Sequence, residues 1–241
     1  MRQRFGSESK HRKRSSQFCS CIVLGSLALG VCLPARAISY DAAGDFSITN
    51  GNPNGVWSYL VSGSLLTEEQ ASCNGVAGIA CWQNGLGVPN FAGILQNTTS
   101  SSIFVNSSVT IPAGAFDVDP ESNTNVTILW TAPSAGTWSY SGFFSGLDAT
   151  SSAHTTYVVL DSSTTLWSIP ISGPGSGSSF SGTEVLNAGD TLGFVVATGA
   201  LFSNLGTGFD ATITMVPEPA TFGLLGLGLA GIAVWRRRRQ L

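Results

Sequence analysis

The sequence predicts an all-β protein, an antiparallel β-sandwich of jelly-roll type, flanked by an N-terminal signal peptide and a single C-terminal transmembrane helix. Between the two ends the chain is rich in Ser, Thr, Gly, Asn, Val and aromatic residues, which favours strands and turns. Short alternating runs recur about every ten residues without helical patterns between them, which favours a sandwich over an α/β fold. Each end combines basic residues with an apolar run.

The first 37 residues have the three parts of a secretory signal peptide. Met1–Phe18 is basic and contains the single acid Glu8, and Cys19–Leu33 is mostly apolar. Pro34 ends the apolar run, and Ala35-Arg36-Ala37 supplies the small residues that precede a cleavage site. We expect cleavage after Ala37, with a permanent N-terminal anchor as the alternative.

Residues 38–215 are long enough to form one domain with a buried core. All 11 Lys and Arg lie in the terminal segments, whereas this body holds every carboxylate of the 14 except Glu8 and Glu218. An acidic body without cations has no phosphate clamp and repels nucleic acid. Neutral partners, cationic partners and divalent metals remain compatible with the charge of the body.

Alternation is clearest in Asn125–Thr131, where Val126, Ile128 and Trp130 share one face of a predicted strand. A turn at Pro133–Gly136 leads into a second strand that begins near Trp138. Further elements are expected as strands at Phe46–Thr49, Val56–Val61, Ile103–Ile111, Tyr157–Leu160, Leu166–Ile171, Thr191–Ala197 and Phe209–Met215, a loop at Gly173–Ser179, and one short helix within Leu65–Ser72.

Cysteine usage agrees with export. Three cysteines lie in the signal peptide, and Cys73 and Cys81 remain as a close pair in the body. In an oxidising compartment such a pair predicts a disulfide. A metal site is the alternative, but two thiols and one distant histidine are too few ligands.

Asp117, Asp119 and Glu121 alternate along a segment that Pro120 interrupts. Hard oxygen ligands of this kind suit calcium, although the spacing is not that of an EF-hand loop. The alternative is a solvated acidic loop. We expect no other cofactor.

No residue pattern predicts catalysis. His154 lies in a Ser/Thr-rich stretch that reads as an exposed turn, and no Gly-x-Ser-x-Gly elbow is present. Glycoside hydrolysis needs two facing carboxylates, and the sequence selects no pair among its glutamates.

Trp82, in a Gly/Asn-rich loop beside the cysteine pair, is the best candidate for an exposed ring that contacts a ligand. Trp130 and Trp138 are expected in the core.

The C-terminal segment begins with Val216, Pro217, Glu218 and Pro219, continues with the uncharged residues 220–235, and ends with Arg236, Arg237, Arg238 and Arg239. A helix over residues 220–235 spans about 24 Å, against roughly 30 Å for a bilayer core. Trp at headgroup depth and arginines on the cytoplasmic side are typical of membrane helices. We therefore predict a transmembrane helix that places the body outside.

Residues 216–241 resemble the PEP-CTERM sorting signal, which combines Pro-Glu-Pro, a short Gly-rich apolar helix and an arginine cluster. The resemblance implies an exosortase-type processing enzyme as partner, an inner-membrane intermediate held by residues 220–235, and a mature protein at the cell surface or secreted. An ordinary tail anchor is the alternative. A soluble core helix is disfavoured because four arginines follow the apolar run.

Three segments of the body, Asp45–Tyr59, Trp130–Tyr140 and Ala188–Phe194, resemble a sandwich domain of secreted bacterial proteins that is similar to carbohydrate-binding modules. The resemblance implies polysaccharide binding. We expect an exported, non-catalytic protein of the surface or extracellular matrix. The alternatives are a β-sandwich hydrolase acting on extracellular polysaccharide and a purely structural surface protein.

Overall fold

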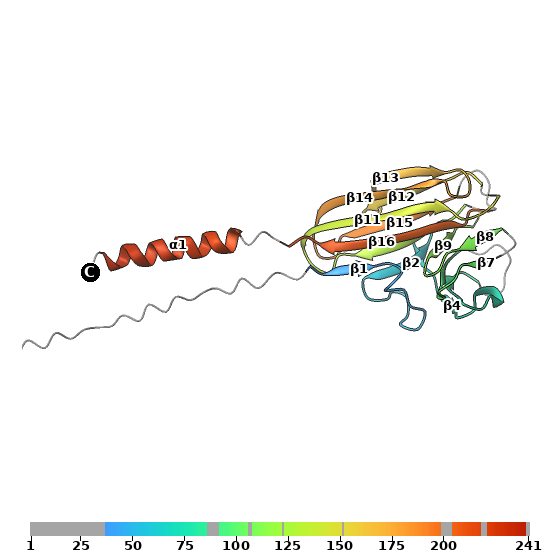
Figure 1. The fold of residues 1–241 in the computed structure, drawn as a ribbon, viewed down its shortest axis with the longest axis horizontal. Helices are drawn as coiled ribbons and strands as arrows, with labels where there is room; N and C mark the ends of the chain where they lie inside the picture. Colours follow the sequence, from blue (N-terminus) through green and yellow to red (C-terminus); the bar gives the residue numbers. More distant parts are fainter. Residues whose placement is uncertain are drawn as a thin grey trace, which may run out of the picture. The chain divides into compact units, whose positions relative to one another are not determined.

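A computed structural model describes residues 37–85, 92–105, 108–121, 123–150, 152–198, 204–217 and 221–239. Up to residue 217, the regular structure that it describes is β, apart from one 3-10 turn, η1 (Cys73–Gly75). The strands form two antiparallel sheets that face each other, as Figure 1 shows, so the predicted β-sandwich is confirmed. The jelly-roll connectivity stays a prediction. The signal peptide, except Ala37, lies outside the described residues.

Sheet A contains eight strands in the order β14-β11-β16-β9-β6-β5-β4, with β1 also paired to β16. Strand β16 is therefore central: β11 covers one of its edges, and β9 and β1 share the other. The bounds of these strands are β1 Ser39–Asp41, β4 Glu68–Gln70, β5 Ile79–Gln83, β6 Gly93–Asn97, β9 Phe116–Asp119, β11 Gly136–Gly146, β14 Gly177–Leu186 and β16 Thr207–Met215.

Sheet B contains six strands in the order β13-β12-β15-β10-β2-β3. Two further short strands, β7 (Ile103–Val105) and β8 (Val109–Ile111), form a separate hairpin. The bounds in sheet B are β2 Trp57–Val61, β3 Ser64–Leu65, β10 Asn125–Thr131, β12 His154–Leu160, β13 Thr164–Ile171 and β15 Thr191–Ala197.

The main core lies between the two sheets. Val126, Ile128 and Trp130 of β10 are fully buried, as the alternation predicted. The indole of Trp130 meets that of Trp138 in sheet A edge to face, with ring centroids 4.9 Å apart. Aromatic pairs prefer this geometry, and the contact packs the inner faces of the two sheets together.

A second apolar cluster packs Ile79, Leu95, Val109 and Ile111 around the two cysteines. It covers sheet A on the face opposite the main core, because neighbouring residues of β5 and β6 divide between the two clusters. Every residue of β5 is consequently buried. The prediction of one strand over Ile103–Ile111 is wrong, since this segment is the β7–β8 hairpin, with residues 106 and 107 not described.

Two other expected elements are absent from the described chain. Phe46–Thr49 is not a strand, although the ring of Phe46 packs 5.3 Å from those of both Tyr59 and Phe116. The helix expected within Leu65–Ser72 is replaced by strand β4, which pairs with β5. Tertiary pairing here overrides the helix propensity of Glu and Gln. The expected loop at Gly173–Ser179 gives way to β14 at Gly177.

The C-terminal segment forms helix α1 (Thr221–Arg238), with Arg236, Arg237 and Arg238 in its last turn. The prediction that residues 220–235 form a transmembrane helix needs correction. No helix in the described part of the chain is long and apolar enough to cross a membrane. The physical reason is length: 18 residues less three arginines leave an uncharged stretch of about 22 Å, whereas a bilayer core measures about 30 Å. Glu218 and Pro219 lie outside the described residues.

Candidate functional site

A groove crosses the outer face of sheet B. Thr127 and Leu129 point outward because their neighbours in β10 face the core. At the centre of the face, Gly193 of β15 lies between Leu129 of β10 and Val159 of β12. Glycine contributes no side chain here, and the side chains of Val159 and Leu129 approach the space that a Cβ would take. The groove that these residues line has a volume of about 390 Å³.

The groove runs from β13, across β12, β15 and β10, to the β2–β3 turn. Tyr157 contributes an aromatic ring to it, Leu129 and Val159 contribute apolar walls, and Asn125 and Thr165 contribute polar groups towards its two ends. With strands about 4.8 Å apart, its length across five strands is about 19 Å. It can therefore hold an extended ligand rather than a single small ring.

Two tight hairpin turns fix the ends of the groove. Ser62 and Ser162 line opposite ends and have positive φ values of 46° and 58°. Non-glycine residues seldom adopt this conformation, but tight hairpin turns such as those between β2 and β3 and between β12 and β13 use it. Asp161, with φ of 48°, is held by the backbone N–H of Thr191, which donates to its Oδ1 at 2.8 Å. The ends of the groove are thus preformed.

The groove has no charged side chain among its lining residues. Hydroxyl, amide, aromatic and aliphatic groups alternate along it. Concave sites that combine apolar surface with a few convergent polar groups are typical of small-molecule and sugar recognition. The chemistry of this groove suits an uncharged, polyhydroxylated ligand.

The predicted disulfide is present. The Sγ atoms of Cys73 and Cys81 are 2.05 Å apart. The bond ties η1 to β5 and is buried inside the second apolar cluster.

Trp82 is not the exposed ring that the sequence suggested. It is only 4% exposed and belongs to the main core. Its Nε1–H donates to the carbonyl oxygen of Ser47 at 2.9 Å. The loop expected around it is strand β5, and the covering of both faces of that strand explains the burial.

The acidic segment is part of a sheet rather than a solvated loop. Asp117 and Asp119 lie in β9, and Asp117 is 3% exposed, with no hydrogen-bond partner for its Oδ1. Burial, and secondarily the nearby Asp148, raises the pKa of Asp117 to about 7, although the backbone N–H of Thr207 opposes the shift. Glu121 follows the strand, and no three His, Cys, Asp or Glu side chains of the described chain are arranged to hold a metal ion.

His154 is likewise not an exposed turn residue. It begins β12, is 3% exposed, and both ring nitrogens have partners. Burial lowers the pKa of its imidazole. This histidine is structural.

Sequence reasoning missed the groove because its parts are far apart in the chain. One signal was available: Gly193 stands mid-way in the correctly predicted strand Thr191–Ala197. A glycine in a strand interior often marks a place where another group approaches closely.

Comparisons with known proteins give separate findings for the C-terminal tail and for the body of the chain. Residues 216–239 match the PEP-CTERM protein-sorting motif, so the chain carries this motif at its C-terminal end. No curated protein matches the sequence.

Several solved carbohydrate-binding modules are among the structures to which this chain is similar. A family 35 module from Clostridium thermocellum has 9% identity and a TM-score of 0.30, covering 74% of this chain and 98% of that one. The CBM22-1 xylan-binding domain of Paenibacillus barcinonensis Xyn10C has 8% identity and a TM-score of 0.33, covering 76% and 95%. A xylan-binding domain of family 22 has 12% identity and a TM-score of 0.34, covering 73% and 93%. At these TM-scores the similarities carry no conclusion about the fold or the function of this chain.

Proposed function

We propose that this chain is an exported, non-catalytic protein that binds an uncharged polysaccharide in the groove of sheet B. In this proposal residues 1–37 direct export, residues 38–215 form the binding domain, and residues 216–241 sort the protein to the cell surface or the extracellular matrix. The observation that carries the binding role is the preformed, charge-free groove with Tyr157 in its wall.

The lining explains why a sugar chain is the ligand. Hydroxyl and amide groups such as those of Thr165 and Asn125 both donate and accept hydrogen bonds, as sugar hydroxyls do. The ring of Tyr157 and the side chain of Leu129 offer apolar surface to the CH groups of a pyranose. Anionic glycans are disfavoured because the body has no Lys or Arg to pair with them.

The tail explains how the protein reaches such a ligand. The PEP-CTERM motif supports an exosortase-type enzyme as the processing partner. Residues 220–235 and Arg236–Arg239 are the apolar and basic parts of this sorting signal. Cleavage near Pro217-Glu218-Pro219 then separates the acidic body from these arginines.

Calorimetric titration of the purified full chain with soluble neutral polysaccharides (xylan, glucomannan and dextran) tests the binding role. We expect binding of at least one, and Tyr157→Ala should weaken it about tenfold, or ~1.4 kcal/mol. Tyr157→Phe keeps the ring and should retain most of the affinity. Phe104→Ala, at a 63% exposed ring in β7, is the matched control and should change nothing.

Two results would contradict the proposal. One is the absence of binding to every neutral polysaccharide in a panel extended beyond these three. The other is release of new reducing ends from a bound polysaccharide, abolished by Glu121→Gln or Glu184→Gln, which would establish the hydrolase instead.

A further inference from the structure

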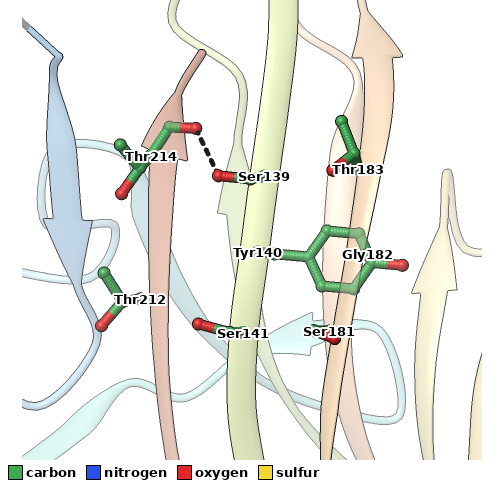
Figure 2. A pocket seen from close by; sticks show the side chains of 8 residues that line it. All are labelled: Ser139, Tyr140, Ser141, Ser181, Gly182, Thr183, Thr212 and Thr214. Carbon is green, nitrogen blue, oxygen red and sulfur yellow. Dashed lines mark hydrogen bonds between the residues drawn. The ribbon is translucent and has the colours of Figure 1, made fainter.

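The outer face of sheet A carries two rows of hydroxyl groups. Strand pairing aligns Thr183, Ser139, Thr214 and Ser39 in one row, and Ser181, Ser141 and Thr212 in the next. Figure 2 shows six of these side chains on β11, β14 and β16, with the ring of Tyr140 reaching across to Gly182. We call the six the hydroxyl face: Ser139, Ser141, Ser181, Thr183, Thr212 and Thr214. They line a hollow of about 320 Å³.

Most of these hydroxyls make no hydrogen bond to any residue that the structure describes. Ser139 donates to the carbonyl oxygen of Thr214 at 3.2 Å, and the hydroxyl oxygens of Thr214 and Ser39 are 2.9 Å apart. Among the described residues, the other four hydroxyls of the hydroxyl face make no hydrogen bond to protein. Each can donate once and accept twice. The face is therefore an array of free donors and acceptors.

An exposed aromatic ring continues the same face. Phe143 follows Ser141 by two residues on β11, so it points outward too, and it is 38% exposed. It lines an adjoining hollow of about 330 Å³, which the loop at residues 112–115 bounds. From Ser139 to Ser145 the track along β11 is about 20 Å long.

The charged residues near this track indicate which class of ligand it binds. The strands that form it contain no Lys or Arg, and Asp210 lies beside Phe143 in the pairing register. Asp41 pairs with Thr212 at the other side. Carboxylates at the edge repel uronates and sulfated glycans, whereas hydroxyls and an aromatic ring complement an uncharged sugar chain.

We infer that the hydroxyl face together with Phe143 is a second binding surface for an uncharged polysaccharide. This inference rests on the proposed function and deepens it. The outer faces of sheets A and B lie on opposite sides of the sandwich, so an extended, stiff chain bound to one does not reach the other. Two bound chains are instead held about one sandwich thickness apart, and the protein cross-links neutral polysaccharides.

Stoichiometry tests the second surface directly. The full chain is titrated by calorimetry with short neutral oligosaccharides derived from whichever of the three polysaccharides it binds. We expect two per chain for the wild type and one for Phe143→Ala combined with Thr212→Val, which keeps the shape of Thr212 but removes its hydroxyl. Tyr157→Ala should also leave one, and the combination of all three substitutions none. Thermal melting verifies that each variant is folded.

The outcomes separate the two proposals. A single site that is lost in Tyr157→Ala and unaffected by Phe143→Ala overturns the second surface while the groove stands. A single site lost only in the sheet A variant supports the second surface and overturns the groove. With two sites, the wild type should also raise the viscosity of a polysaccharide solution, and either single-face variant should not.

Discussion

Nε2 of His154 lies 2.7 Å from Oγ1 of Thr207, and this contact joins β12 of sheet B to β16 of sheet A. On the other side of the ring, Nδ1 lies 2.8 Å from the carbonyl oxygen of Ser152. A carbonyl can only accept, so Nδ1 carries the proton. In the neutral ring Nε2 is an acceptor, and the single proton of the Thr207 hydroxyl is shared between Nε2 and the carbonyl oxygen of Leu205, which lies 2.7 Å from Oγ1. A buried polar contact thus links the two sheets.

Thr207→Val should destabilise the fold because it removes the buried hydroxyl that contacts both Nε2 of His154 and the carbonyl oxygen of Leu205. The expected loss in the free energy of unfolding is about 1 to 3 kcal/mol, the usual cost of an unsatisfied buried group. Urea denaturation measures it. Thr212→Val makes the same change on the outer face and should stay within about 0.5 kcal/mol of the wild type. Equal stability of the two variants would contradict a structural role for the contact.

The free energy of unfolding should rise as the pH falls from 7 towards 5. Asp117 has a pKa of about 7 in the folded protein and 3.8 ordinarily, so the folded state binds a proton that the unfolded chain lacks in this window. That stabilisation is complete below the unfolded pKa and is lost as pH rises through about 7. Burial raises the pKa of Asp119 in the same direction. His154, with a lowered pKa, opposes them below 6.5.

Denaturation at several pH values checks this prediction. Each carboxyl contributes up to about 1.4 kcal/mol per pH unit, and two carboxyls outweigh one histidine. Asp117→Asn should remove its share of the slope, whereas Glu69→Gln, at an exposed position of β4, should leave the slope unchanged. Stability that decreases steadily from pH 7 to pH 5 in the wild type would refute the assignment.

Reducing the Cys73–Cys81 bond should destabilise the lobe around β5 and the β7–β8 hairpin. The bond closes a loop with a sequence separation of 8, for which loss of chain entropy gives about 2 to 3 kcal/mol. Equilibrium unfolding of Cys73→Ser/Cys81→Ser measures the loss. Hydrogen exchange should show increased opening in β5 and β6, while β10 and β15 remain protected. Uniform loss of protection would show that the lobe does not open independently.

Replacing Pro217, Glu218 and Pro219 with alanines should leave the chain unprocessed at its C-terminus. The PEP-CTERM motif is the basis for this expectation. Mass spectrometry of the C-terminal peptide, in strains with and without the exosortase, measures processing. Arginine-to-lysine changes at residues 236–239 retain the positive charge and should process normally. Normal processing of the alanine variant would identify the tail as an anchor alone.

Local patterns predicted the parts of the fold that depend on neighbours in the chain. Asn125–Thr131 and Thr191–Ala197 form strands with the expected bounds, because alternation with period two records which face is buried. Strands β5 and β9 escaped prediction. Both faces of β5 are covered, so its residues show no alternation of polar and apolar types. Strand β9 does alternate apolar and acidic residues, but over only four positions, and its acids suggested a metal-binding segment instead.

The sequence by itself determined the all-β class, the acidic body, the cysteine pair and the sorting tail, since each depends on composition or on short spacings. Only the tertiary structure decided the burial of polar and aromatic side chains outside the alternating strands. It placed Trp82 and His154 inside, and it brought Gly193 between Leu129 and Val159 to form the groove. Strand order sets these relationships, and pairing between residues distant in the chain leaves no periodic signal in the sequence.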